Sequence, residues 1–227
     1  ANPSGAVVPD DEMARLATLA RDADLVLISD ESLDESLGGE ARHSSPAAFP
    51  EAADRTVVIG SFSYLYGLAS WRVGYLAGIQ ALIRPLRVLK QAMSICTSAM
   101  AQYAALAAMS GPQGWLEQRR RDLDTKRAFV LDVLDGLGLP HSQPAASPFV
   151  LVDVREMART SEEWATWLLP TAGIAVLPGS RFGSQGEGYV RLSLWPTLSQ
   201  LEEGMRRLKK GPLLADAGRP STERSAP

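Results

Sequence analysis

The chain has 227 residues, a length that fits one large domain or two modest ones. Its 45% apolar and 22% charged residues lie near the globular average, which excludes a fibrous protein and long disordered regions. There are 23 Lys and Arg against 26 Asp and Glu, so the net charge is −3. A nucleic-acid binder normally has a basic excess, and we therefore expect no nucleic-acid partner.

The only cysteine, Cys96, lies in an apolar stretch with helical character. One cysteine excludes a disulfide framework within the chain and a Cys-rich zinc site, so we expect Cys96 to be a small core residue. The N-terminus has no basic run followed by an apolar run, and no stretch reaches the roughly 18 apolar residues of a membrane span. These features predict a reducing compartment, the cytoplasm, and no membrane partner.

The first half of the chain contains three short apolar runs, over residues 24–29, 56–60 and 72–78. Runs without polar alternation are typical of buried strands in a parallel or mixed sheet that is covered on both faces. Apolar spacing predicts a first helix from Pro9 to Asp24, which Asp10 and Asp11 can cap. An alanine-rich segment over 83–109 predicts one long helix.

The second half begins after the segment GPQG, residues 111–114, which breaks the helical pattern and predicts a domain boundary. A long helix is expected up to Gly136, and apolar runs predict strands over 149–154, 174–179 and 189–195. The pairs Thr160/Glu163 and Thr197/Gln200 have the spacing of capping boxes, so a helix is expected after each. The polar segment 212–227 is expected to be a mobile tail.

Five short motifs follow one another in a distinctive order. They are NPSG at 2–5, ISDES at 28–32, SFSYLYGLASWRVGY at 61–75, VLPGSRFG at 176–183 and EGYVRLS at 187–193. Any one of them alone is a weak signal. Together, over residues 1 to about 210, they resemble the class I/II aminotransferases, which are fold type I enzymes that use pyridoxal phosphate (PLP).

The resemblance implies cofactor contacts for three groups of residues. Asn2 matches the amide that hydrogen-bonds the PLP ring hydroxyl. Asp30 matches the buried carboxylate that keeps the pyridine nitrogen protonated, which makes the ring an electron sink. Ser61 and Arg72, with Ser63 nearby, match the ligands of the phosphate, a dianion that needs hydroxyl donors and a guanidinium.

The resemblance also implies a substrate contact, because Arg191 matches the arginine that binds the substrate carboxylate in a bidentate manner. Two positions depart from the family pattern. Tyr64 stands where the family has the lysine that forms a Schiff base with PLP, and a phenol cannot form an imine. Leu33 stands where the family usually has a tyrosine that donates to the ring hydroxyl. Tyr64 remains a candidate acid or base, although a phenol has an ordinary pKa near 10.

The motif residues also have plain structural interpretations. Asp30 can be a loop or cap carboxylate, Arg72 can pair with a carboxylate, and Arg191 can form a salt bridge on its strand. The serines can be turn residues, and Tyr64 can be an inert replacement in a decayed site.

We expect an α/β fold: a truncated fold type I aminotransferase scaffold with a partial mixed or parallel sheet and a small α+β C-terminal domain. Residues 1–112 would be the remnant of the PLP-binding large domain, 113–211 the small domain, and 212–227 the tail. The family's first half has no counterpart in the chain, and a sheet of about three strands has long unpaired edges. The resemblance implies a homodimer.

Three hypotheses of function follow. The chain is a repurposed biosynthetic enzyme that binds a small carboxylate- or phosphate-bearing molecule, with PLP or its amine form (PMP) held noncovalently or dispensed with. Alternatively, it is a non-catalytic partner subunit that complements a full-length, aminotransferase-like chain. Thirdly, it is an engineered or fragmentary aminotransferase, in which Tyr64 replaces the natural lysine; the loss of the tyrosine at Leu33 argues against this.

Overall fold

The computed structural model describes residues 1–34, 42–145, 147–157 and 159–210. The expected tail, 212–227, lies outside the described residues. The chain divides into two compact units, which are described separately. We call residues 7–120 the N-terminal unit, and residues 1–6 with the chain from Arg121 onward the C-terminal unit. The division falls within helix α4 (Gly114–Gly136).

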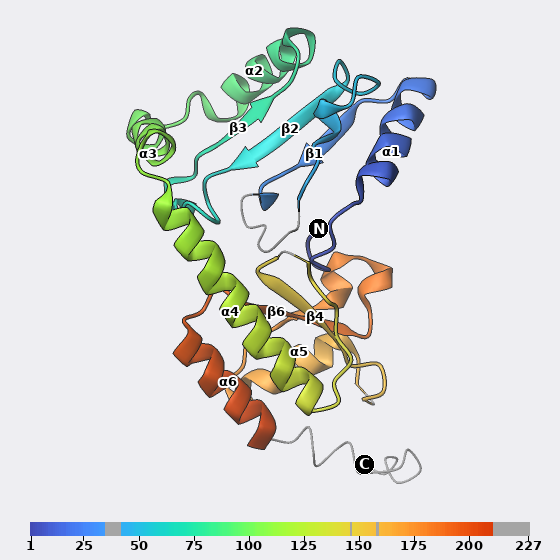
Figure 1. The fold of residues 1–227 in the computed structure, drawn as a ribbon, viewed down its shortest axis with the longest axis vertical. Coiled ribbons are helices and arrows are strands. Elements are labelled where there is room, and N and C mark those ends of the chain that lie inside the picture. Colours follow the sequence, from blue (N-terminus) through green and yellow to red (C-terminus); the bar gives the residue numbers. More distant parts are fainter. Residues whose placement is uncertain (35–41, 146, 158, 211–227) are drawn as a thin grey trace. The chain divides into compact units, whose positions relative to one another are not determined.

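The sheet of the N-terminal unit has the strand order β1-β2-β3 (Figure 1). The strands are β1 (Leu27–Asp30), β2 (Thr56–Ser61) and β3 (Gly74–Ala77). β1 runs parallel to β2, and β3 runs antiparallel to β2. The expected mixed sheet of an α/β fold is therefore confirmed.

The outer strands of this sheet are more exposed than the sequence predicts. β1 alternates between half-buried and exposed residues, with Ile28 72% exposed, and all four residues of β3 are exposed. An apolar run predicts burial only if neighbours cover both faces and both edges of the strand. Within the described residues, β1 and β3 each have β2 as their only strand neighbour.

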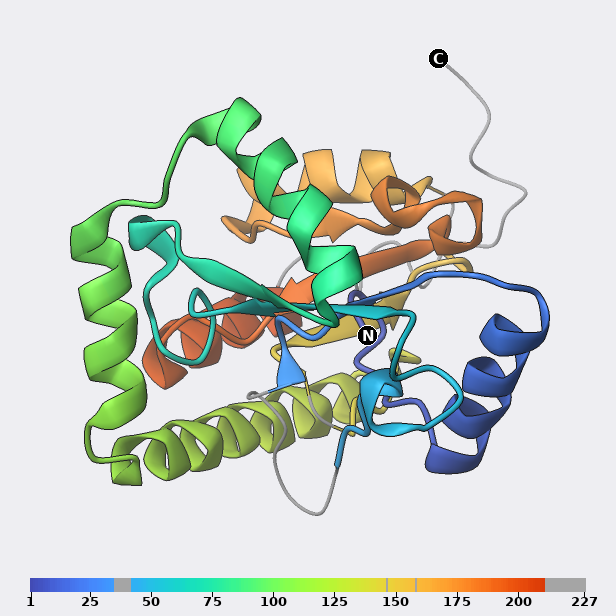
Figure 2. The ribbon, with the colours of Figure 1, turned by 90° about the horizontal axis from the view of Figure 1, so that it is seen from above.

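Three helices belong to the N-terminal unit: α1 (Asp10–Asp22), α2 (Gln80–Ser94) and α3 (Ala99–Ser110). Figures 1 and 2 show α2 alongside β3. The first helix is confirmed with slightly shorter bounds than the expected Pro9 to Asp24. Its N-cap is Pro9 without a side-chain cap, so the predicted capping by Asp10 and Asp11 is wrong. Both aspartates lie in the first turn instead, where the helix dipole stabilises their negative charges. The single helix expected over 83–109 is wrong, because Ile95 adopts a φ of 57° and separates α2 from α3. Cys96 lies in this break and is exposed, so its predicted core position is also wrong.

The sheet of the C-terminal unit has the order β4-β6-β5 and is antiparallel. Its strands are β4 (Phe149–Asp153), β5 (Leu177–Pro178) and β6 (Tyr189–Ser193). The strand expected over 174–179 is thus only two residues long. Helices α5 (Ser161–Ala172) and α6 (Leu198–Lys210) complete the unit with α4. Short 3₁₀ turns occur at η2 (Pro46–Ala48), η3 (Ala69–Trp71), η4 (Gly179–Phe182) and η5 (Ser184–Gly186).

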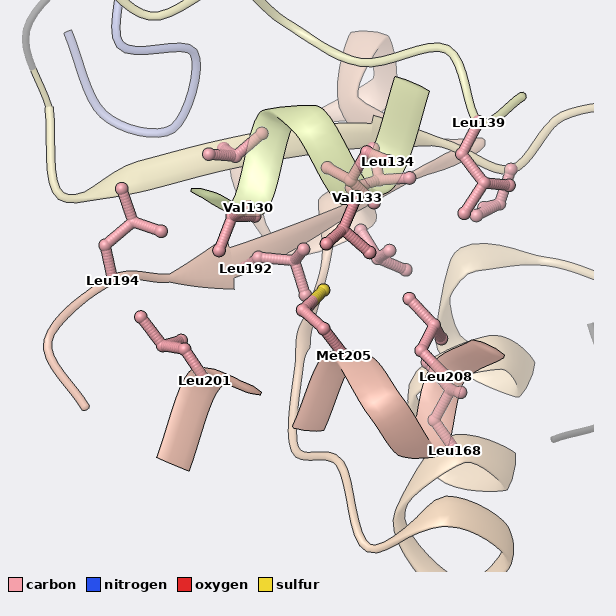
Figure 3. Close-up of a cluster of buried hydrophobic side chains, with 14 of the residues drawn as sticks. Val130, Val133, Leu134, Leu139, Leu168, Leu192, Leu194, Leu201, Met205 and Leu208 are labelled. Atoms are coloured by element: carbon pink, nitrogen blue, oxygen red, sulfur yellow. The ribbon is translucent and has the colours of Figure 1, made fainter. Parts of the chain in front are cut away.

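The capping-box prediction is confirmed for α5, where the Thr160 hydroxyl accepts from Glu163 N and the Glu163 carboxylate accepts from Thr160 N. Behind the sheet lies one continuous apolar core (Figure 3). Val130 and Leu134 of α4, Leu192 of β6 and Met205 of α6 contribute to it and are almost fully buried. Among the described residues, no helix is both long and apolar enough to cross a membrane.

Candidate functional site

Asp30 and Ser61 lie at the same end of the sheet in the N-terminal unit. Each is the last residue of its strand, and β1 and β2 are parallel neighbours in which Asp30 pairs with Ile59. In α/β proteins, ligands bind at the carboxyl ends of parallel strands. The Asp30 carboxylate is exposed and accepts hydrogen bonds from the backbone N–H of Ser32, at 3.1 Å, and from the Ser32 hydroxyl. The turn therefore holds this carboxylate at the strand end.

The loop from Ser61 to Arg72 is anchored by buried apolar side chains. Phe62 packs with Val73, Ala101 and Ala105, and its carbonyl accepts from Leu68 N at 2.9 Å. These contacts hold the two ends of the loop against α3.

Hydroxyl and guanidinium groups lie at the two ends of this loop. The Ser61 hydroxyl accepts from Ser63 N at 3.1 Å. Arg72 has a left-handed backbone, with φ 52°, and its Nη1 donates to Ala69 O at 2.9 Å. Ser61 pairs with Gly74 across the β2–β3 ladder, so Arg72 is two residues from the partner of Ser61. A Cβ at Gly74 would lie 2.6 Å from Gly60 O, so only glycine fits there.

Tyr64 is half-buried within the same loop. Its backbone carbonyl accepts from Arg119 Nη2 at 3.3 Å, and the next residue, Leu65, is 2% exposed. These two contacts fix the loop backbone at Tyr64 and at the residue that follows it.

The second group of candidate site residues is centred on Arg191, in the C-terminal unit. Arg191 is in the middle of β6, the central strand, where it pairs with Leu151 on one side and Leu177 on the other. Its Nη1 donates to Asn2 Oδ1 at 2.7 Å. Two residues 189 positions apart in sequence are thus in direct contact.

Two aromatic rings hold the plane of the Arg191 guanidinium. Its Cζ lies 3.9 Å from the ring centroid of Phe149 and 5.0 Å from that of Phe182. Cations over aromatic faces are attracted by the ring quadrupole. The sequence motifs did not identify either ring as part of the site. The β4–β6 register explains the place of one of them: Phe149 pairs with Ser193, so it is a diagonal neighbour of Arg191.

The structure therefore brings the predicted residues together in two groups. Asn2 and Arg191 are in contact within the C-terminal unit. The N-terminal unit contains the remaining candidates, at the ends of β1 and β2 and in the loop that follows β2. They are Asp30, Ser61, Ser63, Tyr64 and Arg72.

Hydroxyl and guanidinium groups after a parallel strand, and a stacked arginine on a second sheet, are groups whose chemistry suits a small anion. Residues 1–208 match the family "Aminotransferase class I and II". The chain belongs to this aminotransferase family, which is PLP-dependent.

Individual relatives agree with this assignment. The chain is 31% identical over 211 residues to an aspartate aminotransferase of Pyrococcus abyssi, covering 92% of this chain and 54% of the relative. It is 36% identical over 208 residues to an arginine–pyruvate transaminase of Pseudomonas aeruginosa, covering 91% and 53%. A solved structure of aspartate aminotransferase from Thermus thermophilus with maleate has a TM-score of 0.85 and 30% identity, covering 92% and 54%. The chain thus spans about half the length of the relatives it matches.

The polar groups of the N-terminal unit suit the phosphate of PLP but not its aldehyde. Hydroxyls and a guanidinium at Ser61, Ser63 and Arg72 suit a phosphate. The aldehyde of PLP needs an amine to form an imine, and position 64 offers a phenol. The residues present therefore allow a noncovalent anion and do not support covalent attachment at Tyr64.

Proposed function

We propose that this chain is an aminotransferase-like protein that binds a small carboxylate-bearing molecule through Arg191, without an imine link to the protein. The observation that supports this best is the Arg191 guanidinium, which is held by Asn2 at 2.7 Å and stacked on Phe149 at 3.9 Å. A planar guanidinium with a fixed orientation is the side chain that binds a carboxylate through two parallel hydrogen bonds.

A second anion-binding position is proposed at Ser61, Ser63 and Arg72, for the phosphate of PLP, of PMP or of a phosphorylated small molecule. PLP supplies an electron sink when it is bound. In this proposal, Arg72 neutralises the phosphate, the two serine hydroxyls donate to it, and the Asp30 carboxylate faces a cationic ring nitrogen. Tyr64 is the candidate group for holding or moving a proton at its phenol oxygen.

The proposal that the protein is an enzyme rests on these retained polar groups, since a purely structural role requires neither a stacked arginine nor a set of phosphate donors. The cytoplasm is the proposed compartment, supported by a chain with a single cysteine.

The test is a calorimetric titration of the full chain with PLP, PMP and maleate. Arg72→Ala should weaken PLP and PMP binding at least tenfold and leave maleate unchanged. Arg191→Ala should weaken maleate binding at least tenfold and leave PLP and PMP binding unchanged. Arg15→Ala, which removes an exposed arginine on α1, serves as the matched control and should change none of the affinities.

Two results would contradict the proposal. One is the absence of saturable binding of all three ligands at millimolar concentration. The other is equal weakening by all three arginine substitutions, which would indicate only a general effect of positive charge.

A further inference from the structure

Ser147 is a buried polar residue just before β4, and it contacts three different parts of the C-terminal unit. It is 1% exposed. Its hydroxyl accepts from Phe149 N at 3.1 Å, and its carbonyl accepts from Arg127 Nη2 at 3.3 Å. Its Cβ faces Gly5, where an added Cβ would lie 2.9 Å away. Ser147 therefore joins α4, β4 and residues 1–6.

One of these contacts bears on the aromatic ring that stacks on Arg191. Phe149 is 4% exposed and is the first residue of β4, an outer strand of its sheet as far as the structure describes the chain. The Pro148 carbonyl accepts from Leu194 N at 2.8 Å, which ties this end of β4 to the end of β6. The Ser147 hydroxyl binds the neighbouring Phe149 N–H. The backbone of Phe149 is thus fixed where its ring centroid lies 3.9 Å from Arg191 Cζ.

The second contact bears on the turn that contains Asn2. Gly5 N donates to Ala1 O at 2.9 Å and closes this turn. Gly5 has a φ of 74°, and a Cβ there would lie 2.3 Å from Pro144 Cβ as well as close to Ser147. Only glycine allows so close an approach. The turn is thereby packed against the segment before β4, and this packing holds the Asn2 amide in place.

The third contact comes from a buried charge. Arg127 of α4 is 9% exposed and forms an ion pair with Asp124, three residues earlier on the same helix. Taking a guanidinium out of water is costly, and apolar side chains in place of a buried ion pair are often neutral or stabilising. Stability alone therefore does not explain this charge. Its hydrogen bond to Ser147 O directs it to the segment before β4.

We propose that Arg127 and Ser147 are positioning residues for the carboxylate site at Arg191, an inference that rests on the proposed function. Arg127 holds the backbone of Ser147. Ser147 in turn holds the backbone of Phe149 and packs against the turn at Gly5. The guanidinium plane is then fixed before a ligand arrives, and a group held in its binding orientation loses less conformational entropy on binding.

The first measurement uses the full chain without ligand. The Nε–H resonance of Arg191 is assigned in an NMR spectrum by its loss in Arg191→Lys. The ring current of Phe149 shifts this resonance, because the ring lies over the guanidinium. Ser147→Ala and Arg127→Met should each move it toward the resonance of an exposed arginine. Gly5→Ala should also move it, because the added Cβ displaces the turn that contains Asn2.

Two substitutions are matched controls. Lys126→Met removes a neighbouring charge that is also 9% exposed and that pairs with Asp122 on α4. Gly138→Ala places a side chain at a φ of 66°, close to that of Gly5, but no described atom lies within 4 Å of the new Cβ. Both should leave the Arg191 resonance in place, whatever their effect on stability, which urea denaturation measures.

The second measurement is a calorimetric titration with maleate. Ser147→Ala and Arg127→Met should weaken binding at least fivefold, and the two controls less than twofold. Should Arg127→Met fail to fold, Ser147→Ala and Gly5→Ala decide the outcome.

Three results would overturn the proposal: an Arg191 resonance that stays in place in every folded test variant, an equal shift in the controls, or a maleate affinity that the test variants leave unchanged. A wild-type chain that does not bind maleate would contradict the proposed function instead. The Arg191 resonance would then still decide whether Arg127 and Ser147 position the guanidinium.

Discussion

Glu187 accepts two hydrogen bonds from Ser161: one from its backbone N–H and one from its hydroxyl, both at 2.8 Å. The Ser161 hydroxyl in turn accepts from Ser180 N at 3.3 Å. The pair joins the first turn of α5 to the segments on either side, η4 with Phe182 and β6 with Arg191. We therefore expect these hydrogen bonds to stabilise the C-terminal unit.

Ser161→Ala removes the hydroxyl from a fully buried position and leaves Ser180 N without this acceptor. We expect a loss of about 1.5–3 kcal/mol in the free energy of unfolding, the usual value for a hydrogen bond to a charged group. Urea denaturation followed by circular dichroism measures it. Ser199→Ala, at an exposed serine, should stay within about 0.5 kcal/mol of wild type. Equal effects of the two substitutions would show that the Ser161–Glu187 contact contributes nothing.

Leu134→Ala tests the core of the C-terminal unit. Leu134 is fully buried between α4 and the sheet, so truncation removes apolar contacts and leaves a cavity. We expect a loss of about 2–5 kcal/mol. Leu169→Ala provides the matched control, because this leucine is exposed and its truncation should cost about 0.5 kcal/mol or less. Denaturation midpoints of the two variants should therefore differ clearly.

Local sequence signals predicted most of the fold because they act over a few residues. The Thr160/Glu163 spacing located the start of α5, and the apolar spacing of α1 located its buried face. The break at Ile95 was missed because it contains neither glycine nor proline. The burial of β1 was overestimated because an apolar run shows what a strand can bury and not whether its neighbours are present.

The candidate site was only partly predictable, because local motifs identify single residues and not the long-range contacts between them. Motifs located Arg191 and Asn2, but their contact depends on how residues 189 positions apart are folded together. The ring of Phe149 reaches Arg191 only through the β4–β6 register, and Phe182 does so through the turn η4. Register and turn geometry are set by tertiary packing, which a single sequence does not display.

The carboxylate of Glu203 should titrate well below the ordinary pKa of 4.5. Hydrogen bonds from Arg206, then Arg207, on the same face of α6 lower its pKa to about 2. A carboxyl whose pKa is lower in the folded state stabilises that state above pH 4.5, and this contribution is lost as the pH falls from 4.5 through 2. An NMR titration of the Glu203 side chain measures the pKa directly.

Arginine substitutions on α6 provide the control for that titration. Arg206→Gln should raise the pKa of Glu203 more than Arg207→Gln, because Arg206 donates two hydrogen bonds and Arg207 one. High salt should also raise it, since the pairs are partly exposed. A pKa of Glu203 that is the same in both variants as in the wild type would contradict this account.

Tyr64→Lys tests whether the loop after β2 still presents its side chain to a bound PLP molecule. An amine at position 64 can form an imine, and the phosphate donors Ser61 and Arg72 should concentrate PLP beside it. We expect borohydride reduction to trap PLP on the peptide containing position 64, at least tenfold more than on exposed Lys209, as measured by mass spectrometry. Adding Arg72→Ala should reduce trapping at position 64 at least tenfold and leave Lys209 unchanged. Equal labelling of the two positions, insensitive to Arg72→Ala, would show that this loop has lost its capacity to orient PLP.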